Sequence, residues 1–342
     1  MPRSKLVQQL RANLPNNQQR TCPIIMLNFS GKETYKRTKG VLVAFKKEFT
    51  REEVEYLIDL LSDETNIVRL VDPLSEFLVN TDGTLQVGNI CRSVWGRPHR
   101  CENCSSLRAL QTQDVLYKME FCDDRIYWII SRYLNVEGHD CVLEYVVDTT
   151  DSIIIEGGSA DQISEIIDGY NNQVVFDSLT GVFNRNYLDT IFLPTVGFRR
   201  ASQMPIHLAI IDLDNFKDVN DTYGHAAGDK LLTDVGGFWK ARFDSRKKNK
   251  ERLTIRFGGD EMMVICCEGS YDDFAKEIED GYNHMRMSCY IDEMTTIPFT
   301  LSYGTASTEE MVQGAWVWED LFNKADERMY TMKQQHHAER SS

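Results

Sequence analysis

The sequence contains no run of about twenty apolar residues, and the Met1 end lacks the apolar core of a signal peptide. We therefore expect no membrane insertion and a cytoplasmic location. Basic residues are in deficit, because 38 Lys and Arg stand against 52 Asp and Glu, a net charge of −14. Broad binding to nucleic acid needs basic side chains that neutralise phosphates, so we expect no nucleic-acid partner. A nucleotide substrate remains compatible with this charge, because acidic sites bind triphosphates through a bridging metal.

The sequence also lacks the features of a disulfide-rich or disordered chain. Its nine cysteines are an odd number without an export signal, which argues against a disulfide framework. Hydrophobic residues make up 42% of the chain, enough to bury a core, so a disordered chain is excluded. At about 150 residues per domain, the 342 residues predict two domains.

The N-terminal part has a mixed pattern. Residues 1–21 are polar and predict a flexible lead-in, and residues 22–150 predict one α+β domain. Thr50 and Glu53 form a capping-box pattern at the start of a predicted helix, 50–61. Strand-like alternation occurs over residues 66–71, 76–80, 115–121, 126–133 and 141–147. We expect an antiparallel sheet with its helices on one side.

The second half has a different pattern. Residues 151–176 read as a linker that includes a signalling helix over 160–175. From residue 177 to 342, strands and helices alternate, which predicts an α/β domain with a central sheet covered by helices. The predicted strands are 207–213, two within 253–267, and 297–306, and the predicted helices are 228–242, 271–287 and 318–335.

One acidic motif follows a predicted buried strand. Residues 210–217 read IIDLDNFK, so Asp212 and Asp214 come at the carboxyl end of this strand, where open α/β sheets bind ligands. An EF-hand is excluded, because Phe216 takes a ligand position and Lys217 replaces the required glycine. A polar strand end with solvated carboxylates is the alternative.

A second acidic motif lies in a predicted hairpin. Residues 256–262 read RFGGDEM, with alternating residues before the two glycines and apolar residues after them. Two glycines let the backbone approach a bulky anion, and Asp260 and Glu261 follow at once. An ordinary hairpin with exposed acids is the alternative. Together with Asp212, these carboxylates could converge on Mg²⁺, and Lys217 could neutralise charge on phosphoryl oxygens.

Three ordered motifs show what residues 177–335 resemble. The segment opens with DSLTGVFNR at 177–185, continues with IDLDNFK and with NDTYGHAAGD at 220–229, and carries GGDE at 258–261. In these motifs it resembles the GGDEF domain, the catalytic domain of diguanylate cyclases. The resemblance implies a central five-stranded sheet flanked by helices. It also implies condensation of two GTP into cyclic di-GMP with release of two pyrophosphates, in an active unit that is a homodimer.

The resemblance assigns a role to each matching position. It implies two Mg²⁺ ions per site, which Mn²⁺ could replace, held by Asp212, the Leu213 carbonyl and Asp260. Asp260 would also accept the proton of the attacking 3′-hydroxyl, Lys217 would stabilise the transition state, and Glu261 would support the metal site. The implied substrate-binding residues are Asn220 and Asp229 for guanine, Gly258 and Gly259 beside the phosphates, and Lys333 for the terminal phosphate.

Besides lacking the Arg-x-x-Asp of the family's product-inhibition site, whose positions hold Asn249 and Arg252, this chain departs from the family pattern at two places. Met262 replaces a core-facing Phe, and a flexible Met fills such a space with little loss. After Lys333, the usual small, basic ending is replaced by Gln334, Gln335, His336 and His337, which would weaken triphosphate binding. These departures keep open an alternative function, a catalytically silent domain that binds GTP or cyclic di-GMP and acts as a signalling module.

The N-terminal domain resembles a PAS-type sensor, a common companion of GGDEF domains, and its ligand is unknown. Four of its residues, Cys91, His99, Cys101 and Cys104, are spaced so that they could bind zinc or iron. Reduced cysteines packed in a small domain are the alternative. His139 is expected to be a turn residue.

Overall fold

The structure is a computed structural model that describes residues 46–62, 66–150, 160–243, 252–287, 290–291, 296–312 and 315–341. The predictions for the lead-in 1–21, the start of the N-terminal domain and most of the linker before residue 160 lie outside the described residues. Cys22 and Cys289 also lie outside them. Within the described part of the chain, no helix combines the length and the apolar character needed to cross a bilayer.

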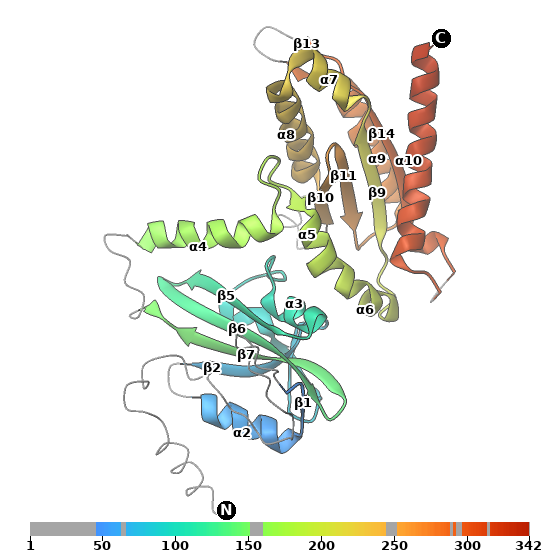
Figure 1. The fold of residues 1–342 in the computed structure, drawn as a ribbon. Helices are drawn as coiled ribbons and strands as arrows, with labels where there is room; N and C mark the ends of the chain where they lie inside the picture. Colours follow the sequence, from blue (N-terminus) through green and yellow to red (C-terminus); the bar gives the residue numbers. More distant parts are fainter. Residues whose placement is uncertain are drawn as a thin grey trace, which may run out of the picture.

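One sheet of seven strands forms the N-terminal domain (Figure 1). The strand order is β1-β6-β7-β2-β3-β4, and β5 also pairs with β6. Every pairing is antiparallel except that of β1 with β6, so the predicted antiparallel sheet is confirmed. The strands are β1 (Glu48–Phe49), β2 (Ile67–Asp72), β3 (Phe77–Val79), β4 (Leu85–Ile90), β5 (Val115–Cys122), β6 (Arg125–Val136) and β7 (His139–Asp148).

Two helices cover opposite faces of this sheet. Helix α2 (Arg51–Leu61) begins at the predicted capping box of Thr50 and Glu53, and it packs on the face that carries Leu134. Helix α3 (Ser105–Thr112) packs on the other face, where the Ser106 hydroxyl lies 3.1 Å from that of Ser131. Leu134 and Ser131 lie three residues apart on β6, so their side chains point to opposite faces. The expectation of helices on one side was therefore wrong.

The second sheet has five strands in the order β14-β9-β11-β10-β8. The pairings are antiparallel except that of β8 with β10. This arrangement confirms the central five-stranded sheet that the family resemblance implies. The strands are β8 (Phe183–Asn184), β9 (His207–Leu213), β10 (Arg252–Gly258), β11 (Glu261–Cys266) and β14 (Leu301–Ser307), and a separate small hairpin pairs β12 (Tyr290–Ile291) with β13 (Thr296–Ile297).

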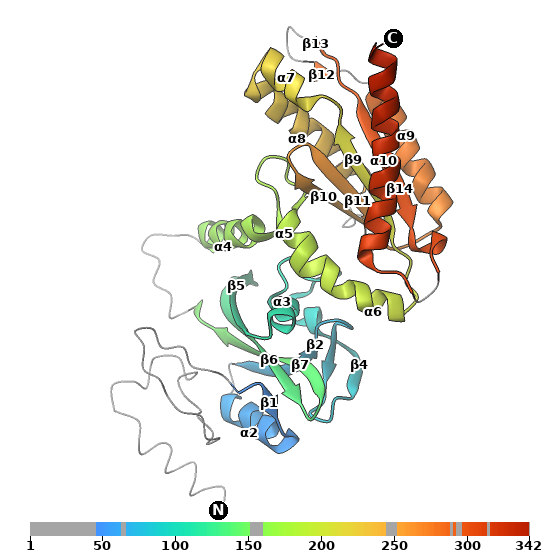
Figure 2. The same cartoon turned by 45° about the vertical axis from the view of Figure 1, so that its right-hand side comes forward.

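Helices lie on both faces of this second sheet (Figures 1 and 2). One face packs against α7 (Phe216–Tyr223), α8 (His225–Arg242) and α9 (Tyr271–Met287), in a core that includes Trp239 and Met262. The other face packs against α10 and the helical segment after β8. These elements are α5 (Arg185–Tyr187), η3 (Leu188–Phe192), η4 (Leu193–Thr195), α6 (Val196–Ala201) and α10 (Trp318–Ser341). Met262 is fully buried, which confirms its predicted place in the core.

Most predicted elements of this half match the structure, and three boundaries differ. Helix α8 begins at His225, three residues earlier than predicted, and β14 begins at Leu301 instead of 297. Helix α10 continues past residue 335 to Ser341. The last difference matters for the site, because it extends one helix along the end of β9.

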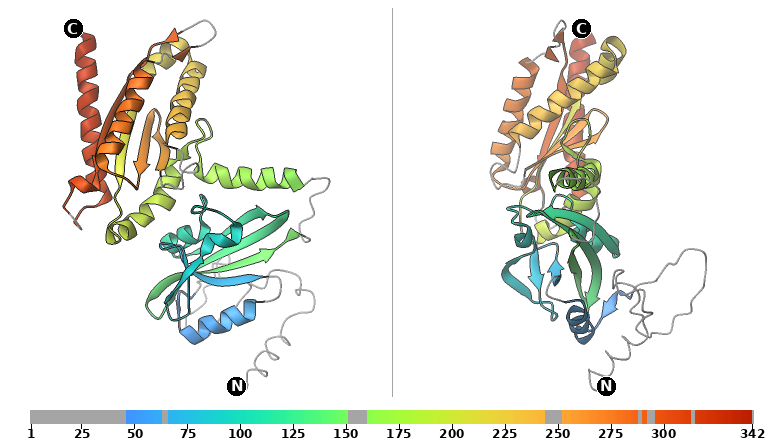
Figure 3. Two further views of the ribbon diagram at one scale, coloured as in Figure 1. Left: turned by 180° about the vertical axis from the view of Figure 1, so that it is seen from behind. Right: turned by 90° about the vertical axis from the view of Figure 1, so that its left-hand side faces the viewer.

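The two domains meet through α3 and through α4 (Ala160–Val175), as Figure 3 shows from two sides. Leu107 of α3 is fully buried in a hydrophobic cluster that also contains Val175 and Leu188 of the second half. Polar contacts support this junction, because the Asn171 amide donates to the Met119 carbonyl at 3.0 Å. Leu107 therefore packs into a core cluster of the second half, while the N-terminal core around Leu134 is a separate cluster.

Candidate active site

Strand β9 brings two carboxylates to the end of the five-stranded sheet. Asp212 lies opposite Glu261 of β11 and opposite Ser302 of β14. The exposed fractions are only 5% for Asp212 and 4% for Asp214. Every residue of β9 is buried, so the strand holds Asp212 in a fixed position at the end of the sheet. Asp214 follows directly after the strand.

The two glycines form the turn between β10 and β11, as the sequence predicts. Gly258 pairs with Glu261 across the turn, and Gly259 has a φ of +46°, in the region that favours glycine. Arg256 stabilises this turn, because its Nε and Nη2 atoms donate to the Gly259 carbonyl at 3.0 and 2.8 Å. The backbone of the hairpin is therefore held in place beside Asp260.

Arg256 also reaches the opening motif of the domain. Its Nη1 atom donates to both carboxylate oxygens of Asp177, at 3.1 and 3.2 Å. Burial opposes ionisation of Asp177, but hydrogen bonds from Thr180 and Arg256 hold the pKa of this carboxyl below its usual range. The end of α4 and the glycine turn are thus linked through one ion pair.

Lys333 of α10 occupies the acidic end of β9. Its Nζ atom lies 2.5 Å from Oδ1 of Asp212. Burial raises the pKa of the Asp212 carboxyl, the Lys333 contact lowers it, and Asp260 and Asp214 raise it further. Burial likewise raises the pKa of Glu261, and the negative charges of Asp212 and Asp260 add to this effect. Neighbouring carboxylates therefore outnumber the one ammonium group that faces them.

This excess of buried negative charge fits a divalent cation. Mg²⁺ prefers carboxylate and carbonyl oxygens and shares its shell with substrate phosphates. Asp212, Asp260 and the Leu213 carbonyl are the groups that would hold it. Among the residues that the structure describes, no three acidic, His or Cys side chains are already grouped around one ion position. Lys333 would therefore leave Asp212 when a cation and a triphosphate enter.

The predicted guanine-binding residues lie on neighbouring helices. Asn220 is on α7, and Asp229 is near the start of α8, exposed to solvent. A Cβ added at Gly228 would overlap the Asn220 amide, so the missing side chain lets the two helices approach here. Lys217 is exposed in the first turn of α7, directly after β9. The structure therefore brings the amide and the carboxylate to one region, with the lysine on the same helix as the amide.

Sequence reasoning did not assign roles to four polar residues near this site. Arg256 and Asp177 hold the glycine turn, and His336 pairs with Asp214 at 2.7 Å between Nδ1 and Oδ2. The signal for the second pair was available, since His336 follows Lys333 by three residues on a helix and Asp214 follows Asp212 by two on a strand.

The cysteine-rich segment of the N-terminal domain has another structural role. Cys104 is the N-cap of α3, where its Sγ atom accepts from the Leu107 amide at 3.4 Å. Burial raises the pKa of Cys91 to about 12 and also raises that of Cys104, which opposes the thiolate form that binds metals. His99 Nδ1 lies 3.2 Å from the Arg100 carbonyl. Among the described residues, no three His, Cys, Asp or Glu side chains are grouped to hold a metal ion, and a site made of Cys91, His99, Cys101 and Cys104 stays a prediction.

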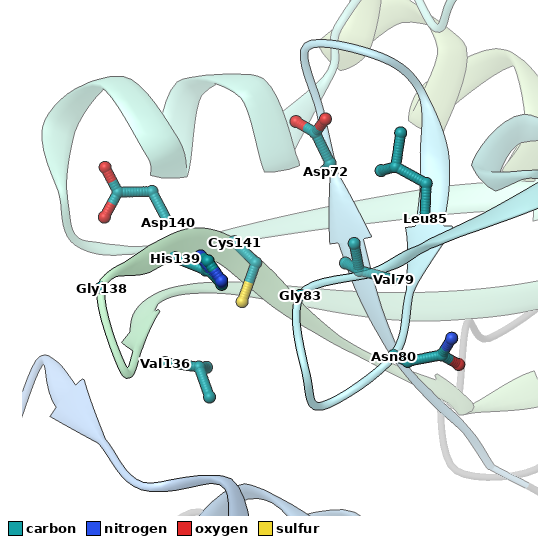
Figure 4. A pocket seen from close by; sticks show the side chains of 10 residues that line it. All are labelled: Asp72, Val79, Asn80, Gly83, Leu85, Val136, Gly138, His139, Asp140 and Cys141. Carbon is teal, nitrogen blue, oxygen red and sulfur yellow. The ribbon is translucent and has the colours of Figure 1, made fainter.

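The N-terminal domain also contains a cavity of about 310 Å³ between the β2–β3–β4 strands and the β6–β7 turn (Figure 4). Val79, Val136 and Cys141 form part of its lining. His139 begins β7, and its ring lies where a Cβ on Gly83 would be, so this residue packs against the neighbouring turn. Both loops at the mouth of the cavity are therefore in contact.

Comparison with known proteins adds an independent finding. Residues 174–339 match the family model described as "Diguanylate cyclase, GGDEF domain". Diguanylate cyclase DosC of Escherichia coli (strain K12) is 32% identical over 165 residues, which cover 47% of this chain and 34% of DosC. Diguanylate cyclase DgcS of Shewanella oneidensis is 29% identical over 171 residues, 47% of this chain and 50% of DgcS.

These two curated relatives are therefore matched over half of their length or less. Among solved structures, the coiled coil and GGDEF domain of DgcB from Caulobacter crescentus, in complex with c-di-GMP, aligns at 22% identity. That alignment covers 51% of this chain and 88% of the other, with a TM-score of 0.45. The family model and the three sequence motifs agree: residues 174–339 of this chain are similar to the GGDEF domain.

Proposed function

We propose that this protein is a diguanylate cyclase that condenses two GTP into cyclic di-GMP and two pyrophosphates. The observation that carries the proposal is that Asp212 and Glu261 lie opposite each other at one end of the sheet, directly after the glycine turn that carries Asp260, with Lys333 paired to Asp212. This arrangement combines a cation site with a mobile ammonium group for a phosphate. Bound Mg²⁺ would supply Lewis-acid activation of the phosphate and of the attacking hydroxyl.

Individual residues of the chain would then have separate roles in binding GTP and in the reaction. Asp229 and Asn220 bind the guanine edge, because a carboxylate accepts from the N1–H and N2–H₂ groups. Asp260 accepts the proton of the 3′-hydroxyl, whose oxygen forms a bond to the α-phosphorus as the bond to pyrophosphate breaks. Lys217 stabilises the charge that develops on the phosphoryl oxygens, and Lys333 binds the terminal phosphate.

The product has twofold symmetry, which requires two sites that face each other. Each domain holds one GTP, and each 3′-hydroxyl must reach the α-phosphate of the other nucleotide. A homodimer with a twofold axis supplies this geometry. We therefore expect the rate per enzyme molecule to rise with protein concentration until the dimer saturates.

We further propose that the N-terminal domain is a PAS-like sensor that regulates the cyclase. Two observations support this role. Its Leu107 packs into a core cluster of the catalytic domain, and it contains the cavity beside His139 that would accept a small ligand.

Product analysis tests the catalytic proposal against the alternative of a silent binding module. The full-length protein is incubated with GTP and Mg²⁺, and the products are separated by chromatography. We expect cyclic di-GMP and pyrophosphate from the wild type, and no product from Asp260→Ala. Asp280→Ala, at an exposed position on α9, serves as the matched control and should retain full activity. Binding of GTP without any product in the wild type would support the silent module instead.

A further inference from the structure

Helix α10 contacts the end of β9 through two polar pairs. Lys333 binds Asp212 at 2.5 Å, and His336 Nδ1 lies 2.7 Å from Oδ2 of Asp214. Residues three apart share a helix face, and residues two apart share a strand face. The two pairs therefore form side by side, and both acceptors belong to the strand that carries the predicted metal ligands.

The second pair, His336 with Asp214, lies among other hydrogen-bonding side chains. Asp214 accepts from the Thr300 hydroxyl at 2.7 Å and from the Ser302 hydroxyl at 2.6 Å. The His336 ring also lies 3.1 Å from the Ser302 hydroxyl and 3.5 Å from that of Tyr282. Because a carboxylate only accepts, the Nδ1 atom of His336 donates to Asp214. The imidazole is thus held by groups from β9, β14 and α9.

This pair lies near the C-terminal end of α10, beyond its main apolar contacts. The apolar contacts of the helix end with Met329 and Met332, which pack on the two cores. Among residues 334–339, His336 alone is not exposed. Beyond Met332, Lys333 and His336 both bind carboxylates at the end of the sheet and so help to hold this part of the helix in position.

We propose that His336 is a positioning residue for the triphosphate, an inference that rests on the proposed function. Lys333 must leave Asp212 when a cation and a phosphate take its place. The His336–Asp214 pair then keeps the end of α10 against β9, so the Lys333 ammonium stays within reach of the terminal phosphate. The ending that replaces the family's small, basic residues thus supports substrate binding in this chain and does not weaken it.

The inference predicts an effect on binding more than on the chemical step. His336→Ala should raise the KM for GTP about tenfold, the equivalent of one charge-assisted hydrogen bond, while kcat changes less than about twofold. His336→Asn should recover most of the loss, because an Asn amide donates from a position close to that of Nδ1. Gln335→Ala, at the exposed neighbouring position, should behave as the wild type.

A binding measurement separates this inference from the proposed activity. The probe is a GTP analogue with a methylene group between the α and β phosphorus atoms, titrated with Mg²⁺ into each full-length variant. We expect the Kd values of the variants to rank as their KM values do: His336→Ala should bind the analogue most weakly, and His336→Asn should bind it nearly as well as the wild type. An unchanged Kd in folded His336→Ala, or no recovery in His336→Asn, would overturn the inference. A wild type that binds the analogue but forms no cyclic di-GMP would refute the activity and leave the binding comparison intact.

Discussion

Gly228 acts through the side chain that it lacks. A Cβ at this position would overlap the Asn220 amide and lie 3.0 Å from the Phe216 ring. Gly228→Ala should therefore displace Asn220 and raise the KM for GTP several-fold, although alanine is the better helix former. Steady-state kinetics on purified full-length protein measures this effect.

Gly237 on the same helix is the matched control for that substitution. A Cβ added there meets nothing within 4 Å. Gly237→Ala should stabilise the domain by about 0.5–1 kcal/mol, because glycine costs that much in a helix interior, and it should leave KM unchanged. Equal KM values for GTP in Gly228→Ala and Gly237→Ala would show that Asn220 does not bind the substrate.

Asp229 should determine which base the site accepts. A carboxylate accepts from the N1–H and N2–H₂ groups of guanine, whereas adenine presents an acceptor at N1. We expect strong preference for GTP over ATP, and Asp229→Ser should reduce that preference mainly by lowering GTP use. Competition assays with both nucleotides measure the ratio. Equal use of ATP and GTP by the unmodified protein would contradict this assignment.

At the scale of elements, the β10–β11 hairpin depends on one arginine. Arg256 donates to the Gly259 carbonyl and to Asp177 with three different nitrogen atoms, a geometry that lysine lacks. Arg256→Lys should lower kcat about ten- to a hundredfold, because small displacements of catalytic groups have effects of that size. Circular dichroism should show an intact fold.

The same strand supplies the control for the hairpin. Arg252 lies at the other end of β10 and pairs with Glu268 at 3.0 Å and with Glu277 at 2.8 Å. Arg252→Lys should leave kcat within about twofold, since it changes a similar ion pair far from the turn. If both substitutions lower kcat equally, the effect comes from the strand and not from the glycine turn.

The N-terminal sheet contains a buried ion network on β5. Glu120 is 2% exposed and accepts from Arg97 at 3.0 and 2.8 Å, and Lys118 Nζ also contacts it. Burial opposes ionisation, but the two cations hold the pKa of Glu120 below its usual range. A lowered folded-state pKa stabilises the protein above the unfolded pKa, and this stability is lost as the pH falls through the folded pKa.

Removal of that carboxylate should therefore change both the size and the pH dependence of stability. Glu120→Gln should lower the free energy of unfolding by about 3–5 kcal/mol at neutral pH, because the buried Lys118 and the half-buried Arg97 lose their partner. Below about pH 5, the stability of Glu120→Gln should fall less steeply than that of the wild type, because the variant lacks the carboxylate that becomes protonated. Urea titrations across pH measure both effects.

Glu53→Gln is the control for this experiment. Glu53 pairs with Lys46 at the surface, and glutamine preserves the capping box of α2. We expect a change below about 1 kcal/mol, since exposed ion pairs contribute little. A loss as large as that of Glu120→Gln would mean that burial does not set the strength of these pairs.

At the scale of the whole molecule, Leu107 joins the two domains. It is fully buried in a cluster with Val175 and Leu188. Leu107→Ala should cost about 2–5 kcal/mol and loosen the contact between α3 and the catalytic domain. If the N-terminal domain controls the cyclase through this contact, GTP turnover by the full chain should change as well.

Leu134→Ala separates coupling from simple destabilisation. Leu134 is equally buried but belongs to the core beneath α2, inside the N-terminal domain. Leu134→Ala should destabilise the N-terminal domain about as much as Leu107→Ala does, but it should change GTP turnover less. The same change in turnover for both variants would show that loss of domain stability, and not the junction, alters activity.

Much of the catalytic half could be predicted from the sequence. Strand His207–Leu213, helix Tyr271–Met287 and the glycine hairpin carry their patterns locally, and their positions are confirmed. The partner of Asp177 could not be predicted, because Arg256 lies 79 residues away in the sequence. For Asp214 and His336, 122 residues apart, the sequence offered only their spacing from Asp212 and Lys333. Such pairs depend on how α10 and β10 pack against the sheet.

The sequence by itself determined the order of elements, the acidic motifs and the similarity of the second half to the GGDEF domain, because these depend on local periodicity and on short ordered motifs. The tertiary structure alone decided which faces are buried. On β5, Lys118 and Glu120 are buried while Tyr117 is 56% exposed, the reverse of what polarity suggests. The physical reason is that Arg97 and Glu120 satisfy each other's charge beneath α3 and α4, and no local pattern contains that pairing.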